Sequence, residues 1–165
     1  MKTFMKIAKI VLNTVTTIII ILGILFIGLF CFGIQPYVVE SGSMEPTIHT
    51  GSVCFVNKRA KYDDMQVNDI IAFKIDSDVF ATHRIVSKTA DGFETKGDAN
   101  NIIDGVITTK DNFLGKNIFS IPKAGFIVKG LQTTRGKIIL STVIIVIFLA
   151  GILLGEPSKK KKDDN

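Results

Sequence analysis

The chain has 165 residues, 47% of them hydrophobic, and its 20 Lys and Arg outnumber its 15 Asp and Glu, giving a formal net charge of +5. The excess lies at the two ends, because residues 33–137 carry 13 basic and 12 acidic side chains. A nucleic-acid-binding domain would show a basic stripe with interleaved aromatic residues. No such stripe is present, so nucleic acid is excluded as the expected partner.

The first predicted element is a transmembrane helix over residues 10–33. No charged residue lies between Ile10 and Phe32, and a spanning helix needs about 20 apolar residues. A cleavable signal peptide is the alternative, but its apolar core would be only about 7–15 residues long. Residues 1–9, which contain three Lys, are predicted to form a basic cytoplasmic tail.

Residues 34–137 are predicted to form one small all-β domain. The stretch Ile34–Glu40 is expected to be extended, and long helical periodicity is absent between residues 50 and 130. Short apolar runs separated by Gly, Asn, Asp and Pro are typical of strands and their turns. Five such runs are the predicted strands: Ser52–Asn57, Asp69–Ile75, Val79–Lys88, Gly92–Thr95 and Lys116–Ile121.

A second transmembrane helix is predicted over residues 138–155, followed by a disordered, Lys-rich cytoplasmic tail at 156–165. A buried core helix is the alternative, but the uniform Ile, Val and Leu content and the Lys159–Lys162 run favour a span. Basic flanks remain in the cytoplasm. Both tails are therefore predicted to be cytoplasmic, and the domain between them to face the extracytoplasmic side.

Residues 41–47 read Ser-Gly-Ser-Met-Glu-Pro-Thr, a turn that can present a hydroxyl group. Ser43 is the candidate nucleophile, and a serine becomes nucleophilic only when a base takes its proton. A neutral imidazole is the usual base. His83, inside a predicted strand, is the first candidate, and His49, six residues after Ser43, is the competing one.

Two acidic residues follow in the Asx-rich stretch from 95 to 105. A carboxylate can orient the imidazole and stabilise its charged form, and either Asp98 or Asp104 could do so. The two cysteines, Cys31 and Cys54, suggest neither a disulfide framework nor a metal-ligand spacing. We interpret them as apolar fillers and expect neither metal nor cofactor.

Taken in chain order, these pieces resemble the type I signal peptidases over roughly residues 10–130. The matching blocks are Ser41–Thr47, Val67–Phe73, Thr82–Ile85, Lys96–Asn100 and Ile121–Phe126. The usual bacterial branch has Lys at the position of His83. In this sequence His stands there, and Glu45 and Pro46 follow Met44. The sequence therefore resembles the ER-type branch of eukaryotes, archaea and some Gram-positive bacteria.

The resemblance implies a mainly β catalytic domain that removes signal peptides from preproteins by Ser-His-Asp chemistry. It implies Ser43 as nucleophile, His83 as base, Asp104 as the best match to the orienting acid, and Asp98 as a supporting residue. Ser41 would add an oxyanion donor. The choice between the two acids stays open.

The resemblance further implies a multi-pass protein of the cell membrane, or of the ER membrane in a eukaryote. The expected partners are preprotein substrates and the lipid bilayer, with a secretion translocon as a further candidate. Phe80 and Ile85, near the base, are the candidates for the substrate pockets.

Three other interpretations compete with this one. A catalytically inactive membrane adaptor of the same fold is the main alternative, and the intact set of candidate residues argues against it. A self-cleaving repressor-type protease would need a Lys base and an N-terminal DNA-binding domain. The third interpretation is a two-span membrane protein in which the motifs occur by chance.

Overall fold

The computed structural model describes residues 2–76 and 79–154, so the predicted tail at 156–165 lies outside the described residues. The chain divides into two compact units. One is Phe26–Gly130 and contains the whole sheet. The other is formed, within the described residues, by the segments 2–25 and 131–154.

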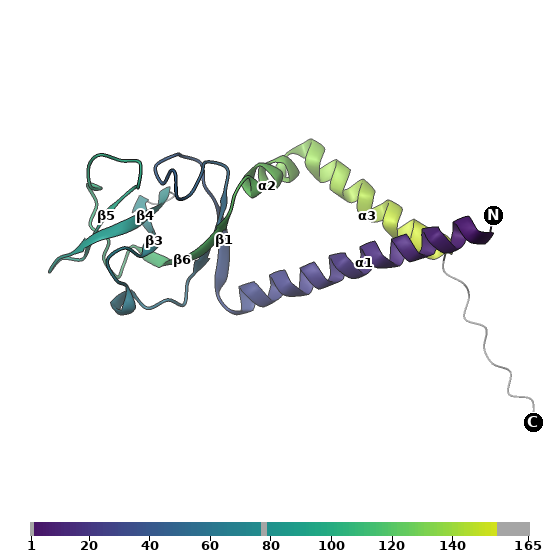
Figure 1. Ribbon diagram of the computed structural model, residues 1–165, viewed down its shortest axis with the longest axis horizontal. Coiled ribbons are helices and arrows are strands. Elements are labelled where there is room, and N and C mark those ends of the chain that lie inside the picture. Colours follow the sequence, from purple (N-terminus) through teal and green to yellow (C-terminus); the bar gives the residue numbers. More distant parts are fainter. Residues whose placement is uncertain (1, 77–78, 155–165) are drawn as a thin grey trace, which may run out of the picture. The chain divides into compact units, whose positions relative to one another are not determined.

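The first unit, Phe26–Gly130, is the sheet unit. It is built on a six-stranded sheet with the strand order β1-β2-β6-β3-β4-β5 (Figure 1). All neighbouring strands are antiparallel. The strands are β1 (Ile34–Val38), β2 (Val53–Asn57), β3 (Ile70–Asp76), β4 (Val79–Lys88), β5 (Phe93–Lys96) and β6 (Phe113–Ile121). Every strand overlaps a segment predicted to be extended, which confirms a mainly β domain.

Two features of this unit differ from the prediction. Strand β6 begins at Phe113, three residues earlier than expected, because Phe113 pairs with Phe73 of β3. The all-β prediction also missed a nine-residue helix, α2 (Ala124–Gln132), and a single 3₁₀ turn, η1 (Tyr62–Asp64).

Two clusters of buried side chains form the core of the sheet unit. The larger consists of Met65, Ile71, Phe73, Ile85 and Phe93, and the smaller of Met44, Ile48 and Cys54. Full burial of such a side chain is worth about 1.5–3 kcal/mol. Burial also raises the pKa of the Cys54 thiol to about 11. Cys54 therefore serves as a packing residue, as expected.

Two apolar helices, α1 (Lys2–Cys31) and α3 (Thr134–Leu154), flank the six-stranded sheet in sequence. Within them, Thr3–Cys31 and Thr134–Ile152 are long and apolar enough to cross a bilayer. A left-handed Gly33, with φ of 78°, follows the end of α1. Its N–H donates to the carbonyl of Phe30 at 2.9 Å, which is a usual way for a helix to end.

Candidate active site

The nucleophile turn, residues 41–47, is closed by its own backbone and anchored by one apolar side chain. The N–H of Glu45 donates to the carbonyl of Gly42 at 3.0 Å, and that of Ile48 to the carbonyl of Met44 at 2.9 Å. Met44 is only 2% exposed, in the smaller core cluster. Packing of Met44 into the core thus leaves its neighbour Ser43 at the surface of a groove.

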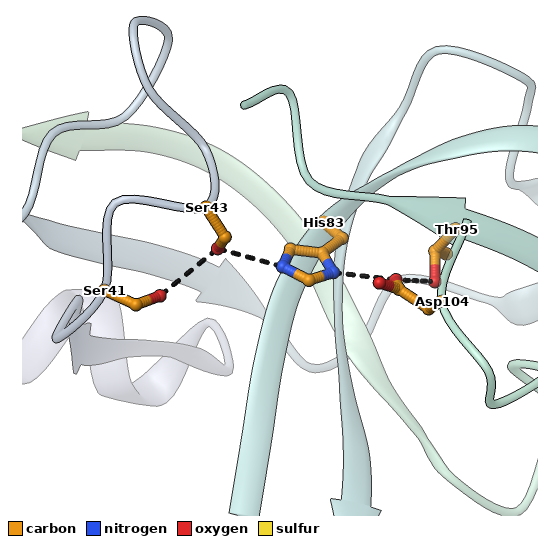
Figure 2. Close-up of polar contacts among 5 residues, drawn as sticks. All are labelled: Ser41, Ser43, His83, Thr95 and Asp104. Atoms are coloured by element: carbon orange, nitrogen blue, oxygen red, sulfur yellow. Dashed lines mark hydrogen bonds and ion pairs between the residues drawn. The ribbon is translucent and has the colours of Figure 1, made fainter. Parts of the chain in front are cut away.

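His83 lies on β4, opposite Ile71 of β3, and is 8% exposed. Its Nε2 atom is 2.9 Å from Oγ of Ser43, and its Nδ1 atom is 2.7 Å from Oδ2 of Asp104. Figure 2 shows the three side chains in line, with the imidazole between the hydroxyl and the carboxylate. The competing candidate, His49, is exposed, and the ring bonded to Ser43 is that of His83.

Thr95 of β5 holds Asp104 by two hydrogen bonds. The Thr95 hydroxyl donates to Oδ2 of Asp104 at 2.6 Å, and the Asp104 N–H donates to the Thr95 carbonyl at 2.8 Å. Thr95 is fully buried and pairs with Ile85 of β4. The pairing of β5 with β4 therefore determines where the Asp104 carboxylate meets His83.

Asp98 lies outside this line and binds a different set of groups. Its Oδ1 accepts from Nε of Arg84 at 2.8 Å, and its Oδ2 from Nη2 of Arg84 and from the Thr47 hydroxyl, each at 2.6 Å. These bonds, led by those from Arg84, hold the pKa of Asp98 below its usual value. Asp98 thus connects β4, at the residue after His83, to the end of the nucleophile turn.

The loop from 96 to 100 also contacts the nucleophile turn through its backbone. The N–H of Ala99 donates to the carbonyl of Ser43 at 2.8 Å. A Cβ atom on Gly97 would lie only 2.5 Å from the same carbonyl oxygen, so this position requires glycine. The Lys-Gly-Asp-Ala-Asn block therefore positions the backbone of Ser43.

Two donors stand close to the Ser43 hydroxyl. Oγ of Ser41 lies 3.2 Å from Oγ of Ser43 (Figure 2). Among the described residues, none accepts a hydrogen bond from the backbone N–H of Ser43. This N–H and the Ser41 hydroxyl are therefore available to an oxygen that approaches the nucleophile.

Ser43 and His83 open into a groove of about 560 Å³. Its remaining lining is mainly apolar: Tyr37, Val38, Val39, Met44, Ile48, Ala72, Ile75, Val79, Phe80, Ala81 and Leu114 are among the residues. Phe80 is in this lining, as predicted. Ile85 is not, because it is fully buried in the larger core cluster with Met65, Ile71, Phe73 and Phe93; its prediction as a pocket residue was wrong.

Residues 11–116 match the family described as signal peptidase, peptidase S26. This match covers more than half of the chain. The chain belongs to the signal peptidase family. Signal peptidase I W of Bacillus subtilis (strain 168) is 35% identical over an alignment of 117 residues that covers 64% of this chain and 62% of that protein.

Two further relatives are named as catalytic subunits of the signal peptidase complex. The signal peptidase complex catalytic subunit SEC11 of Colletotrichum graminicola is 30% identical over 102 residues, 54% of this chain and 59% of that protein. SEC11C of Canis lupus familiaris is 35% identical over 86 residues, 48% and 44% of the two chains. The chain thus spans less than two thirds of the length of these relatives. They support the resemblance to the ER-type branch.

Sequence reasoning named Ser43, His83 and Asp104, which the structure brings together, but it missed three polar partners. Thr95 sits in a predicted strand, where its hydroxyl had no visible partner. Arg84 directly follows the proposed base, and Thr47 is the last residue of the block that contains the nucleophile. The signal for both residues was their place within the matching sequence blocks. No group of three His, Cys, Asp or Glu side chains in residues 2–76 and 79–154 could hold a metal ion.

Proposed function

We propose that this signal peptidase family member is a membrane-bound serine endopeptidase that removes N-terminal signal peptides from preproteins. The observation that carries the proposal is the continuous set of hydrogen bonds from Ser43 through His83 to Asp104 at the surface of an apolar groove. A nucleophile, a base and an orienting acid in this order are the parts that acyl transfer requires.

In the proposed reaction, Oγ of Ser43 attacks the scissile carbonyl carbon while Nε2 of His83 accepts the hydroxyl proton. His83 then gives that proton to the leaving amine, which is the N-terminus of the mature protein. Water attacks the resulting ester, again with His83 as base, and releases the signal peptide as a carboxylate. Asp104 keeps Nδ1 of His83 protonated and stabilises the imidazolium between these steps.

The negative charge on the carbonyl oxygen would be stabilised by two groups near the nucleophile. These are the N–H of Ser43 and the hydroxyl of Ser41, whose Oγ lies 3.2 Å from that of Ser43. Donors placed where charge develops commonly contribute about 10²–10³ in rate. Ser41 is therefore a proposed oxyanion donor rather than part of the proton relay.

The substrate would bind as an extended strand in the groove. In the described parts of the sheet, β1 pairs only with β2, and β4 pairs with β5 only from Arg84 onward. The backbone edge of β4 from Val79 to His83 is thus free, and both it and Tyr37–Glu40 line the groove. A peptide could add to either edge, and the apolar lining favours small, apolar side chains before the cut.

The two apolar helices would place this site at a membrane. The proposal puts both tails in the cytoplasm and the sheet unit on the extracytoplasmic side of the cell membrane, or of the ER membrane in a eukaryote. Ser43 follows Cys31, the last residue of α1, by only 12 residues, which would keep the nucleophile near the bilayer surface. Translocon and accessory subunits remain candidate partners, since two of the relatives are named as subunits of a complex.

The test is cleavage of a preprotein with an Ala-x-Ala site by the full chain in detergent with lipid. Wild type, Ser43→Ala and His83→Ala run in parallel, and mass spectrometry gives the N-terminus of each product. Cleavage after the small-x-small site by wild type alone supports the proposal. Equal cleavage by all three proteins overturns the proposed site. Activity in a secretion assay that survives Ser43→Ala would favour the inactive adaptor.

A further inference from the structure

The short helix α2 (Ala124–Gln132) lies beyond the family match, which ends at residue 116. It follows β6 closely, and only Thr133 separates it from α3 in sequence (Figure 1). Nothing in the proposed chemistry uses α2. Its side chains and contacts nevertheless indicate a specific role.

The exposed face of α2 is apolar, the reverse of an ordinary surface helix. Phe126 and Ile127 are 60% and 68% exposed, and Leu131, about one turn after Ile127, is 42% exposed. The opposite side holds Gly125, which is buried, and the half-buried Val128. The ring of Phe126 lies against Gly51 but keeps most of its surface exposed, and Ile127 and Leu131 are exposed apolar side chains one turn apart.

The charged residues of this segment are all basic, while Glu40 of another segment pairs with Lys129. From residue 112 to residue 154 the sequence has no Asp or Glu. Four basic residues lie in or beside α2: Lys123, Lys129, Arg135 and Lys137. An apolar face with basic neighbours is typical of helices that lie in the plane of a bilayer whose lipid headgroups are anionic.

The buried side of α2 contacts the wall of the substrate groove. The N–H of Gly125 donates to the carbonyl of Gly51 at 2.8 Å, and the N–H of Gly51 donates to the carbonyl of Val39 at 2.9 Å. A Cβ atom on Gly125 would lie 2.7 Å from the Gly51 oxygen and 2.8 Å from Cγ1 of Val38. The helix is thus seated directly on the segment that precedes the nucleophile turn.

An ion pair adds a second connection at the same place. Nζ of Lys129 lies 2.7 Å from Oε1 of Glu40, and Glu40 lines the groove three residues before Ser43. Both side chains are at least half exposed, so the pair contributes little to stability. The close contact between Gly125 and Gly51 holds the helix in place, and the ion pair orients Lys129 of the helix toward Glu40.

We propose that α2 binds the surface of an anionic bilayer through Phe126, Ile127 and Leu131, and thereby fixes the groove wall Val38–Glu40 relative to the membrane. The inference rests on the proposed function only in placing the sheet unit at a membrane. Seating α2 on lipid would hold the groove at the depth where a signal peptide leaves the bilayer. The occupant of the apolar face is lipid, and a second copy of the chain is the competing outcome.

The direct test uses the absence of tryptophan from the chain. The full chain with Ile127→Trp is reconstituted into vesicles of phosphatidylcholine and phosphatidylglycerol, with and without brominated acyl chains. We expect blue-shifted emission that brominated lipid quenches by about half, as for a ring in the headgroup and acyl boundary. Quenching should weaken when phosphatidylcholine replaces the anionic lipid.

The matched control is Ile102→Trp, on a loop residue that is 78% exposed, which should stay red-shifted and unquenched. Solvent-like emission from Ile127→Trp would overturn the proposal. A blue shift without quenching by brominated lipid would indicate a protein cover, such as a second copy, and would also overturn it. Equal quenching of both variants would remove the special role of α2.

A second measurement links α2 to the groove. Ile127→Asp should lower kcat/KM about tenfold for a preprotein whose signal helix is embedded in vesicles, because the reacting groups lose their alignment. The same variant should cleave a short soluble peptide like wild type, and Ile127→Leu should behave like wild type on both. Equal loss on both substrates would overturn the coupling. A wild type inactive on both would refute the proposed function, while the tryptophan result would still stand.

Discussion

The two carboxylates of the loop after β5, Asp104 and Asp98, hold the candidate site in different ways. Asp104 contacts His83 and the buried Thr95 of β5, so it connects the imidazole to the sheet. Asp98 contacts Arg84 and Thr47, so it acts on the backbone frame of the nucleophile. In the proposed reaction, the same residue type, six positions apart, would serve proton transfer in one place and loop geometry in the other.

This comparison predicts that Ser43 and His83 form one unit with Asp104. Ser43→Ala and His83→Ala should each lower kcat by about 10⁴-fold, and the double variant should lose no more, because a relay that lacks one member gains nothing from the other. Preprotein cleavage by the single and double variants measures this. Multiplicative losses in the double variant would separate the two residues.

Asp98 should affect both folding and rate, each moderately. Asp98→Asn removes the ionic partner of Arg84, and charge-assisted hydrogen bonds are worth about 1.5–3 kcal/mol. We expect the free energy of unfolding to fall by about 2 kcal/mol and kcat by about tenfold, as the nucleophile turn loosens. Thermal unfolding and cleavage kinetics measure the two effects, with Arg84→Lys as the variant that keeps the charge. An unchanged midpoint would show that Asp98 does not clamp the turn.

Thr95 should have a smaller effect that is confined to the rate. Thr95→Val keeps the shape of the side chain but removes one donor to Asp104, which costs about 1 kcal/mol, or about fivefold in kcat. KM should stay unchanged, and Thr95→Ser should restore the rate. A rise in KM, with kcat preserved, would mean that Thr95 shapes the groove instead.

The pH dependence of folding sharpens the role of Asp98 further. Hydrogen bonds from Arg84 lower the pKa of Asp98 in the folded protein, whereas the unfolded carboxyl has a pKa of about 3.9. The stability from Asp98 is therefore fully present above this unfolded value and is lost as pH falls through the lower folded value. The difference in unfolding free energy between wild type and Asp98→Asn should be constant from about pH 5 to 7 and shrink below about pH 4. A difference that grows on acidification would contradict the ion pair.

The sequence predicted the parts of the site that carry local signals. The turn residues around Ser43, the strand around His83 and the Asx-rich loop with Asp104 each have a recognisable pattern. The roles of Asp98 and Asp104 could not be separated, because the pairing of β5 with β4 decides which carboxylate meets the imidazole, and register depends on contacts distant in sequence.

Other features could not be predicted for physical reasons. Helix α2 was missed because its nine residues include two glycines and its apolar residues Ile127 and Leu131 are exposed, so the usual pattern of a buried apolar face is absent. Ile85 was misplaced because it shares a strand with His83, and only packing with residues distant in sequence, such as Met65 and Phe93, puts it in the core instead of the groove.

The most direct test of the account is the single-turnover cleavage rate of Asp104→Asn beside Asp98→Asn, at a temperature where both are folded. Asp104→Asn should be slower than wild type by about 10³–10⁴-fold because His83 loses its orienting acid, and Asp98→Asn by only about tenfold because its contacts act on the turn. Equal rates, or a larger loss in Asp98→Asn, would contradict the assignment of Asp104 as the acid that orients His83.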